Sequence, residues 1–91
     1  SNELVPGNVN FLDTYAWILY KSGKYKEALE WQEKAYEATE EPSATVLEHL
    51  GDILYKLNKQ TEALNYWKEA ATKDGGSEFL QQKIAEKKLY E

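Results

Sequence analysis

The chain has 91 residues, a formal net charge of −5 and no cysteine. This length fits one domain, the acidic balance argues against a binder of the nucleic-acid backbone, and the lack of cysteine excludes disulfides and thiolate metal sites. Aromatic residues make up 13% of the chain, so it has enough large apolar surface to fold. No apolar run approaches the roughly 18 residues that a membrane-spanning helix needs, so we expect no membrane insertion by this segment.

The sequence repeats itself when it is shifted by 35 residues. Between Leu12 and Ala35, ten of the 24 positions carry the same residue as the position 35 places further on. The matching positions are Leu12, Ile18, Leu19, Tyr20, Lys21, Lys24, Glu27, Ala28, Leu29 and Ala35. Such self-similarity is typical of stacked repeat architectures.

Each repeat unit has the apolar spacing of two helices. Gly23 and Asn58 suit the left-handed conformation in which a first helix ends. Asn8, Ser43 and Ser77 are suited to be N-caps, and they follow one another at 35 and 34 residues. The sequence therefore predicts an all-α fold. The expected helices cover residues 9–22, 25–39, 43–57, 60–73 and 77–90.

Large, small and aromatic residues follow a characteristic order in the second unit. The residues that carry this pattern are Leu47, Leu50, Gly51, Leu54, Tyr55, Ala63, Trp67 and Ala70. The pattern resembles the tetratricopeptide repeat family, and the first unit matches it except at Gln32, where an aromatic residue is usual and Trp31 stands one place early. The resemblance implies an α-solenoid of two antiparallel helix pairs in a right-handed superhelical stack, followed by a capping helix.

We expect a single domain over residues 1–91, with repeats at 9–42 and 43–76 and the capping helix at 77–91. The segment Leu4–Pro6 resembles the end of an earlier repeat, so residues 1–8 are interpreted as its tail or as sequence left from cloning. On that interpretation the chain is the C-terminal part of a longer protein. Its composition is similar to that of bacterial repeat proteins. A capping helix needs a polar outer face, for which the candidates are Gln81, Gln82, Lys83, Glu86, Lys87 and Lys88.

The resemblance implies a non-catalytic scaffold that binds a protein or peptide segment in a concave groove lined by the first helices. The predicted groove residues are Asp13, Trp17, Tyr20, Lys21, Glu48, His49, Asp52, Tyr55 and Lys56, with Asn10, Thr14 and Thr45 beside them. Trp17 is a candidate for partner contact because the second unit has Asp52 in its place, whereas Tyr20 and Tyr55 are more readily explained by packing between repeats.

The predicted groove indicates which kind of ligand it would accept. The family's carboxylate clamp uses Lys and Asn at places that here hold Asp13, Trp17, Glu48 and His49, so an acidic tail is not the expected ligand. An acidic and aromatic groove favours a basic or apolar segment.

Other functions find less support in the residues. His49 shares a helix face with Asp52 and could meet Asp13, but one histidine among scattered carboxylates is more often solvated surface. No phosphate-binding loop or Ser-His-Asp arrangement is present. We therefore expect no catalysis, cofactor, metal or nucleic acid. The alternative function is structural, with self-association through the N-terminal face around Phe11, Tyr15 and Ile18.

Overall fold

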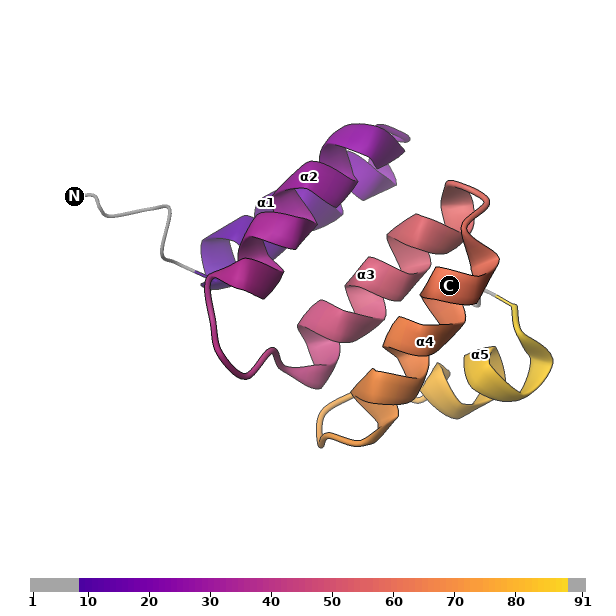
Figure 1. Cartoon of the computed structure of the whole chain (residues 1–91). Coiled ribbons are helices and arrows are strands. Elements are labelled where there is room, and N and C mark those ends of the chain that lie inside the picture. Colours follow the sequence, from indigo (N-terminus) through magenta and orange to yellow (C-terminus); the bar gives the residue numbers. More distant parts are fainter. Residues whose placement is uncertain (1–8, 89–91) are drawn as a thin grey trace.

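The computed structural model describes residues 9–88, which form two antiparallel helix pairs and a short final helix (Figure 1). The helices are α1 (Val9–Lys21), α2 (Tyr25–Glu37), α3 (Ala44–Lys56), α4 (Gln60–Ala71) and α5 (Leu80–Glu86). The prediction of an all-α repeat solenoid is confirmed. The expected N-cap at Asn8 and the interpretation of residues 1–8 lie outside the described residues.

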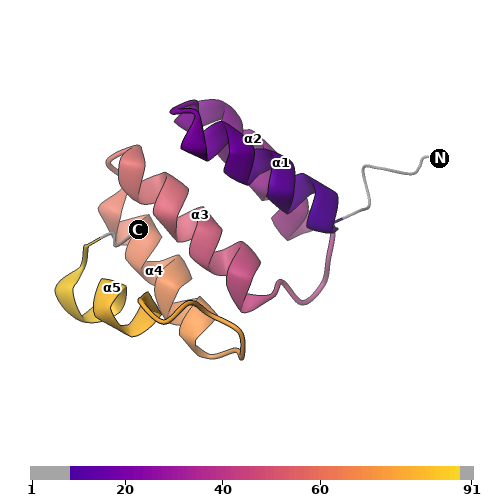
Figure 2. The ribbon, with the colours of Figure 1, turned by 180° about the vertical axis from the view of Figure 1, so that it is seen from behind.

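The helix pairs stack so that the first helix of each pair lies on one side of the molecule and the second helix on the other. In the view from behind, α1, α3 and α5 are nearest to the viewer (Figure 2), whereas α2 and α4 are nearest in Figure 1. None of these five described helices combines the length and the apolar character that crossing a bilayer requires.

The two turns inside the helix pairs are built alike. Gly23 has a φ of +85° and Asn58 a φ of +65°, so both residues adopt the predicted left-handed conformation. In each turn the next residue donates its backbone N–H to a carbonyl five residues back, from Lys24 to Leu19 and from Lys59 to Leu54, each over 2.9 Å. Ser43 caps α3 as predicted, because its Oγ accepts the N–H of Val46 over 3.2 Å.

The last helix differs from the prediction of a helix over residues 77–90 with Ser77 as its N-cap. α5 covers only Leu80–Glu86, and its N-cap residue is Phe79. Ser77 is bound to another helix: its N–H donates to Glu48 Oε1 over 2.8 Å, and its hydroxyl contacts Glu48 Oε2. Its Oγ also accepts the N–H of Phe79 over 3.3 Å, in the turn that precedes α5. α5 ends where Lys87 turns left-handed at a φ of +56°. The other helices begin and end within two residues of the predicted positions.

The core lies where small residues let paired helices approach closely. Six of the described alanines are wholly buried (Ala16, Ala28, Ala35, Ala44, Ala63 and Ala70), and large apolar side chains such as Leu47, Leu50 and Ile53 also lie in the core. Trp67 is 1% exposed and is packed with Leu54, Ala63 and Leu80, so it joins α3, α4 and α5 in one cluster. Burial of apolar surface is the main stabilising term in such a stack.

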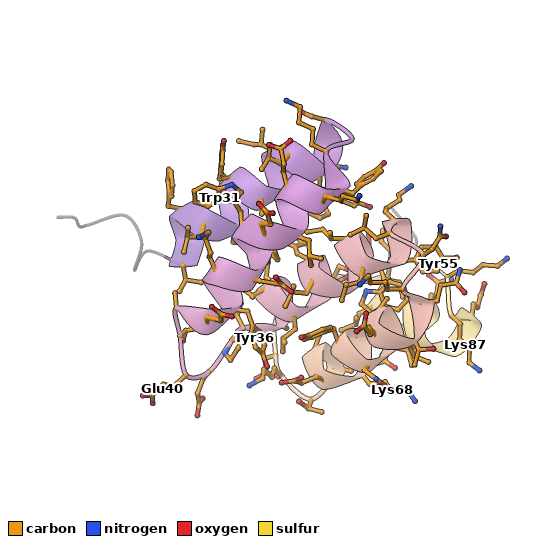
Figure 3. All side chains as sticks on the ribbon, turned by 45° about the horizontal axis from the view of Figure 1, so that its top comes forward. Trp31, Tyr36, Glu40, Tyr55, Lys68 and Lys87 are labelled. Carbon is orange, nitrogen blue, oxygen red and sulfur yellow. The ribbon has the colours of Figure 1, made fainter. Side chains whose placement is uncertain are left out.

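Two aromatic pairs support α2 from different sides. Tyr15 meets Trp31 edge-to-face with ring centroids 4.9 Å apart, and Tyr36 meets Tyr66 edge-to-face at 5.8 Å. Figure 3 shows Trp31 on the side of α2 that faces α1 and Tyr36 near the second helix pair. The first pair therefore joins α1 to α2, and the second joins α2 to α4.

Candidate functional site

A hollow of about 290 Å³ lies between α1, α3 and the segment that leads into α5. It lies among the helices that face the viewer in Figure 2. Its lining residues are Trp17, Lys21, Thr45, Glu48, His49, Asp52, Gly75, Ser77, Phe79 and Lys83. Of these, Lys21, Thr45 and Phe79 are exposed, Trp17 and His49 are partly exposed, and Glu48, Asp52 and Lys83 are buried.

The α1 wall of the hollow is a set of stacked rings. The Trp17 ring is stacked on Tyr20, with centroids 4.5 Å apart, and on His49 of α3, with centroids 3.9 Å apart. Lys21 Nζ lies 5.3 Å from the Trp17 ring centroid, which is within the range of a cation–π contact. These contacts hold the indole in one place, so the wall is rigid before any ligand arrives.

Hydrogen bonds behind this wall fix the His49 ring. His49 Nδ1 donates to Asp13 Oδ1 over 2.9 Å, and Gln32 Nε2 donates to the same oxygen over 2.6 Å. Burial alone would raise the pKa of Asp13, but the hydrogen bond and charge of His49 and the hydrogen bond of Gln32 together hold it below its ordinary value. Asp13 is therefore a partly buried anchor for His49.

The floor of the hollow holds two carboxylates and one ammonium group. Lys83 Nζ of α5 donates to Glu48 Oε2 over 2.6 Å and to Asp52 Oδ1 and Oδ2 over 2.9 and 3.2 Å. Trp67 Nε1 also donates to Asp52 Oδ1, over 3.0 Å. The expected place of Lys83 on the polar outer face of the capping helix is therefore wrong: the residue is 3% exposed, because two buried carboxylates compensate its charge.

The two floor carboxylates differ in proton affinity. Burial raises the pKa of Asp52 to about 6, against the lowering effects of Lys83 and of the Trp67 hydrogen bond. For Glu48, burial also favours the neutral form, but the hydrogen bonds from Lys83 and Ser77 outweigh it and hold the pKa below its ordinary value. Asp52 is therefore the floor carboxylate that takes up a proton first as the pH falls.

The structure brings together five of the nine predicted groove residues. Trp17, Lys21, Glu48, His49 and Asp52 all line the hollow. The other four predicted residues, which are Asp13, Tyr20, Tyr55 and Lys56, do not.

Those four side chains pack elsewhere. Asp13 lies behind His49, and Tyr20 is 2% exposed and packs in a cluster that the first helix pair shares with Ile53 of α3. Tyr55 is stacked on Trp67 at 5.8 Å and is labelled on the second helix pair in Figure 3. Lys56 Nζ lies 6.0 Å from the ring centroid of Tyr25.

Sequence reasoning missed the contribution of the segment before α5 and of α5 itself. Ser77, Phe79 and Lys83 line the hollow, although none was predicted as a groove residue. One signal was available for Lys83. It follows His49 by 34 residues, the spacing that also separates Ser43 from Ser77. Both side chains reach back to an acidic residue of the preceding first helix, His49 to Asp13 and Lys83 to Glu48.

The described residues offer no metal site. Over residues 9–88, no group of three or more histidine, cysteine, aspartate or glutamate side chains is arranged to hold a metal ion.

The comparison with protein families decides the identity of the fold. A tetratricopeptide repeat family model matches residues 12–41 and 43–73. The chain belongs to the tetratricopeptide repeat family. Tetratricopeptide repeats are in general protein–protein interaction modules and typically non-catalytic scaffolds. A comparison with curated proteins finds none that matches this chain.

The departure of the first tetratricopeptide repeat at Gln32 has a structural role. Gln32 is wholly buried, and besides Asp13 its Nε2 group reaches the backbone carbonyl of Val46 over 3.2 Å. The usual aromatic position is thus taken by an amide that links α2 to both α1 and α3. The neighbouring Trp31 packs on Tyr15 instead.

Proposed function

We propose that this tetratricopeptide domain is a non-catalytic interaction module that receives a segment of another protein in the hollow between α1, α3 and α5. The observation that carries the proposal is the ring wall of Trp17 and His49 in a hollow of about 290 Å³ that the exposed Phe79 also lines. Aromatic side chains held in advance give contact area at a small entropic penalty, which favours binding.

The charges of the hollow favour an apolar or aromatic anchor on the partner. Glu48 and Asp52 offer no free carboxylate to a ligand, because both are buried and bound to Lys83. This removes the reason for expecting a basic segment. The accessible side chains are mainly the rings of Trp17, His49 and Phe79, together with Lys21 and the small hydroxyl residues Thr45 and Ser77. We therefore propose a segment with one large apolar residue that enters the hollow.

Selection of peptides from a displayed random library tests this proposal, because it requires no candidate partner. Phe79→Ala and Thr45→Arg alter exposed lining residues, so the fold should persist, whereas Trp17 is unsuitable because it also packs on Tyr20. Truncating an aromatic anchor commonly weakens binding by more than about 2 kcal/mol, so selected peptides should bind each variant at least roughly tenfold more weakly.

The matched control is Glu30→Arg, an exposed change on α2 away from the hollow. It should leave peptide affinity unchanged in calorimetric titrations, and circular dichroism should show the same helix content in all variants. Peptides that bind the Phe79 and Thr45 variants as tightly as the original would disprove the proposed site.

A second candidate function, self-association, rests on the outer face of α1. Tyr15 is 39% exposed and Ile18 57%, while the residues 35 places further on, Leu50 and Ile53, are 1% and 0% exposed. Leu50 and Ile53 belong to the helix that packs against the first pair. The same face of α1 is therefore shaped to receive a helix pair of this repeat type, and a second copy of the chain supplies one.

Sedimentation equilibrium tests self-association directly. If the α1 face joins two copies, the original protein should show a concentration-dependent mass that approaches a dimer, and Ile18→Lys should remain a monomer. Ile18 is the most exposed large apolar residue described, so its replacement should leave the fold intact. A monomer for the original protein at all concentrations would rule this candidate out, and the peptide selection would be unaffected.

A further inference from the structure

The neighbours of His49 decide which of its ring nitrogens is available to a ligand in the hollow. We propose that His49 Nε2 is a hydrogen-bond acceptor there, and that the partner's anchor is an aromatic residue whose ring carries a donor, namely tryptophan or tyrosine. The choice of anchor rests on the proposed function, because it concerns the same hollow. The state of the His49 ring does not depend on that function.

The orientation of the Gln32 amide follows from its two contacts. Its Nε2 group lies 2.6 Å from Asp13 Oδ1 and 3.2 Å from the backbone carbonyl oxygen of Val46. A carbonyl oxygen can only accept a hydrogen bond, so the amide atom that faces both oxygens is the nitrogen. Asp13 Oδ1 therefore accepts a hydrogen bond from Gln32.

The same carboxylate oxygen fixes the tautomer of His49. Burial favours the neutral form of Asp13, but the hydrogen bonds from His49 and Gln32 and the charge of His49 hold its pKa below the ordinary value. The charged carboxylate can only accept, and His49 Nδ1 lies 2.9 Å from Oδ1, so Nδ1 carries the hydrogen. In the neutral imidazole, Nε2 is then an acceptor without a hydrogen.

His49 Nε2 has no partner in the described part of the chain, yet it is not sealed off from solvent. No hydrogen bond joins it to another residue over 9–88. The one buried side-chain nitrogen or oxygen without a partner in that range is Gln32 Oε1. One face of the His49 ring is covered by Trp17 at 3.9 Å, and its Nδ1 edge is turned to Asp13. The edge with Nε2 is therefore left for contact with a ligand.

Three other polar side chains that line the hollow do not require a donor. The ammonium group of Lys21 and the indole N–H of Trp17 can only donate, and the hydroxyl of Thr45 can both donate and accept. An anchor that covers His49 Nε2 without offering a donor would leave an acceptor buried and unpaired, which is unfavourable. Tryptophan and tyrosine supply the donor from a ring that also packs against the ring wall. Phenylalanine, leucine and methionine have no such donor.

Nitrogen NMR on the complete, untagged chain tests the state of the ring without any ligand. His49 is the one histidine of the sequence, so its imidazole signals are unambiguous. In a long-range proton–nitrogen correlation spectrum at about pH 8, where a histidine side chain is ordinarily neutral, Nδ1 should have the chemical shift of a protonated nitrogen and Nε2 that of an unprotonated one. A proton on Nε2 would overturn the proposal.

Peptides selected against the hollow test the anchor. The selected sequences should share tryptophan or tyrosine at one position. Replacing an anchor tryptophan by 3-benzothienylalanine, which has nearly the same shape but no N–H, should weaken binding at least about tenfold in calorimetric titrations at about pH 8. Replacing an anchor tyrosine by phenylalanine should have the same effect. Equal affinities with and without the donor would overturn the proposal.

His49→Phe is the matched change on the protein. It keeps a flat ring beside Trp17 but has no acceptor, so peptides with and without the donor should bind it within about twofold of each other. Because both peptides are compared on the same variant, a general loss of affinity from disturbed packing cancels. If circular dichroism shows that the variant is unfolded, the two peptides on the original protein still decide. A penalty that persists in folded His49→Phe would overturn the assignment of the acceptor to His49.

The failure of this inference is distinguishable from that of the proposed function. If no selected peptide depends on the exposed residues of the hollow, the proposed function is refuted and the choice of anchor is refuted with it. If peptides bind in the hollow without preferring a ring donor, the proposed function stands and the role of His49 alone is refuted.

Discussion

Trp67→Ala is expected to lower the free energy of unfolding by about 3–5 kcal/mol, the usual loss when a buried aromatic side chain is truncated. Trp67 is 1% exposed and contacts residues of α3, α4 and α5 in one cluster. Removal of the indole opens a cavity at the point where three helices meet. The buried carboxylate of Asp52 also loses the hydrogen bond that Trp67 Nε1 donates to it. A domain of this size has only a small reserve of stability, so the midpoint of urea unfolding should fall strongly.

Trp67→Phe is the matched control for the hydrogen bond. It keeps an aromatic ring in the cluster but cannot donate to Asp52 Oδ1, so we expect a smaller loss of about 1–3 kcal/mol. Urea titrations followed by circular dichroism measure both variants. A loss below about 1 kcal/mol for Trp67→Ala would contradict the assignment of this residue to the core.

The second large effect is expected from Gly51→Ala, a change that would stabilise most helices. Alanine exceeds glycine in helix propensity by about 1 kcal/mol. Here the added Cβ would overlap the Trp67 ring atoms Cδ1 and Nε1 and lie 3.0 Å from the Ala63 carbonyl oxygen. We expect a net loss of about 1–3 kcal/mol, because neither the buried ring nor the α4 backbone can move away.

A comparison with the first repeat explains why the effects of Gly51→Ala and of a change at Trp67 should be coupled. Residues 35 places before Gly51 and Trp67 are Ala16 and Gln32, so the repeat with the smaller glycine has the larger indole. If size complementarity is the reason, Gly51→Ala should be less harmful in a Trp67→Phe background than alone. A double-mutant cycle in urea measures this coupling, and strictly additive effects would show that Gly51 is not limited by the Trp67 ring.

The match between sequence and structure is best where local chemistry decides the conformation. Gly23 and Asn58 end their helices, and Ser43 caps α3, because the left-handed turn and the N-cap depend on the residue itself and its immediate neighbours. Ser77 shows the limit of that reasoning. It has the same side chain as Ser43, yet it is bound to a carboxylate from α3, its Oγ accepts the N–H of Phe79 in a turn, and α5 begins three residues after it.

The candidate site was predicted in part. The family resemblance put Trp17 and His49 on the groove side of the first helices, and in the structure both residues line the hollow. The resemblance could not show that Trp17 is stacked on His49, or that Tyr20 is buried. Both depend on how closely α1, α2 and α3 approach one another.

The sequence by itself determined the repeat, the helical pairs, the family and the turns between paired helices, since each follows from spacing or from a residue's own conformational preference. Only the tertiary structure decided which polar residues are buried and which groups they bind. Lys83 looks like a solvated lysine on a short terminal helix, but it is buried because Glu48 and Asp52, more than 30 residues away, meet its ammonium group. Charge compensation depends on distances in space, and for these residues it outweighs the preference of a charged side chain for water.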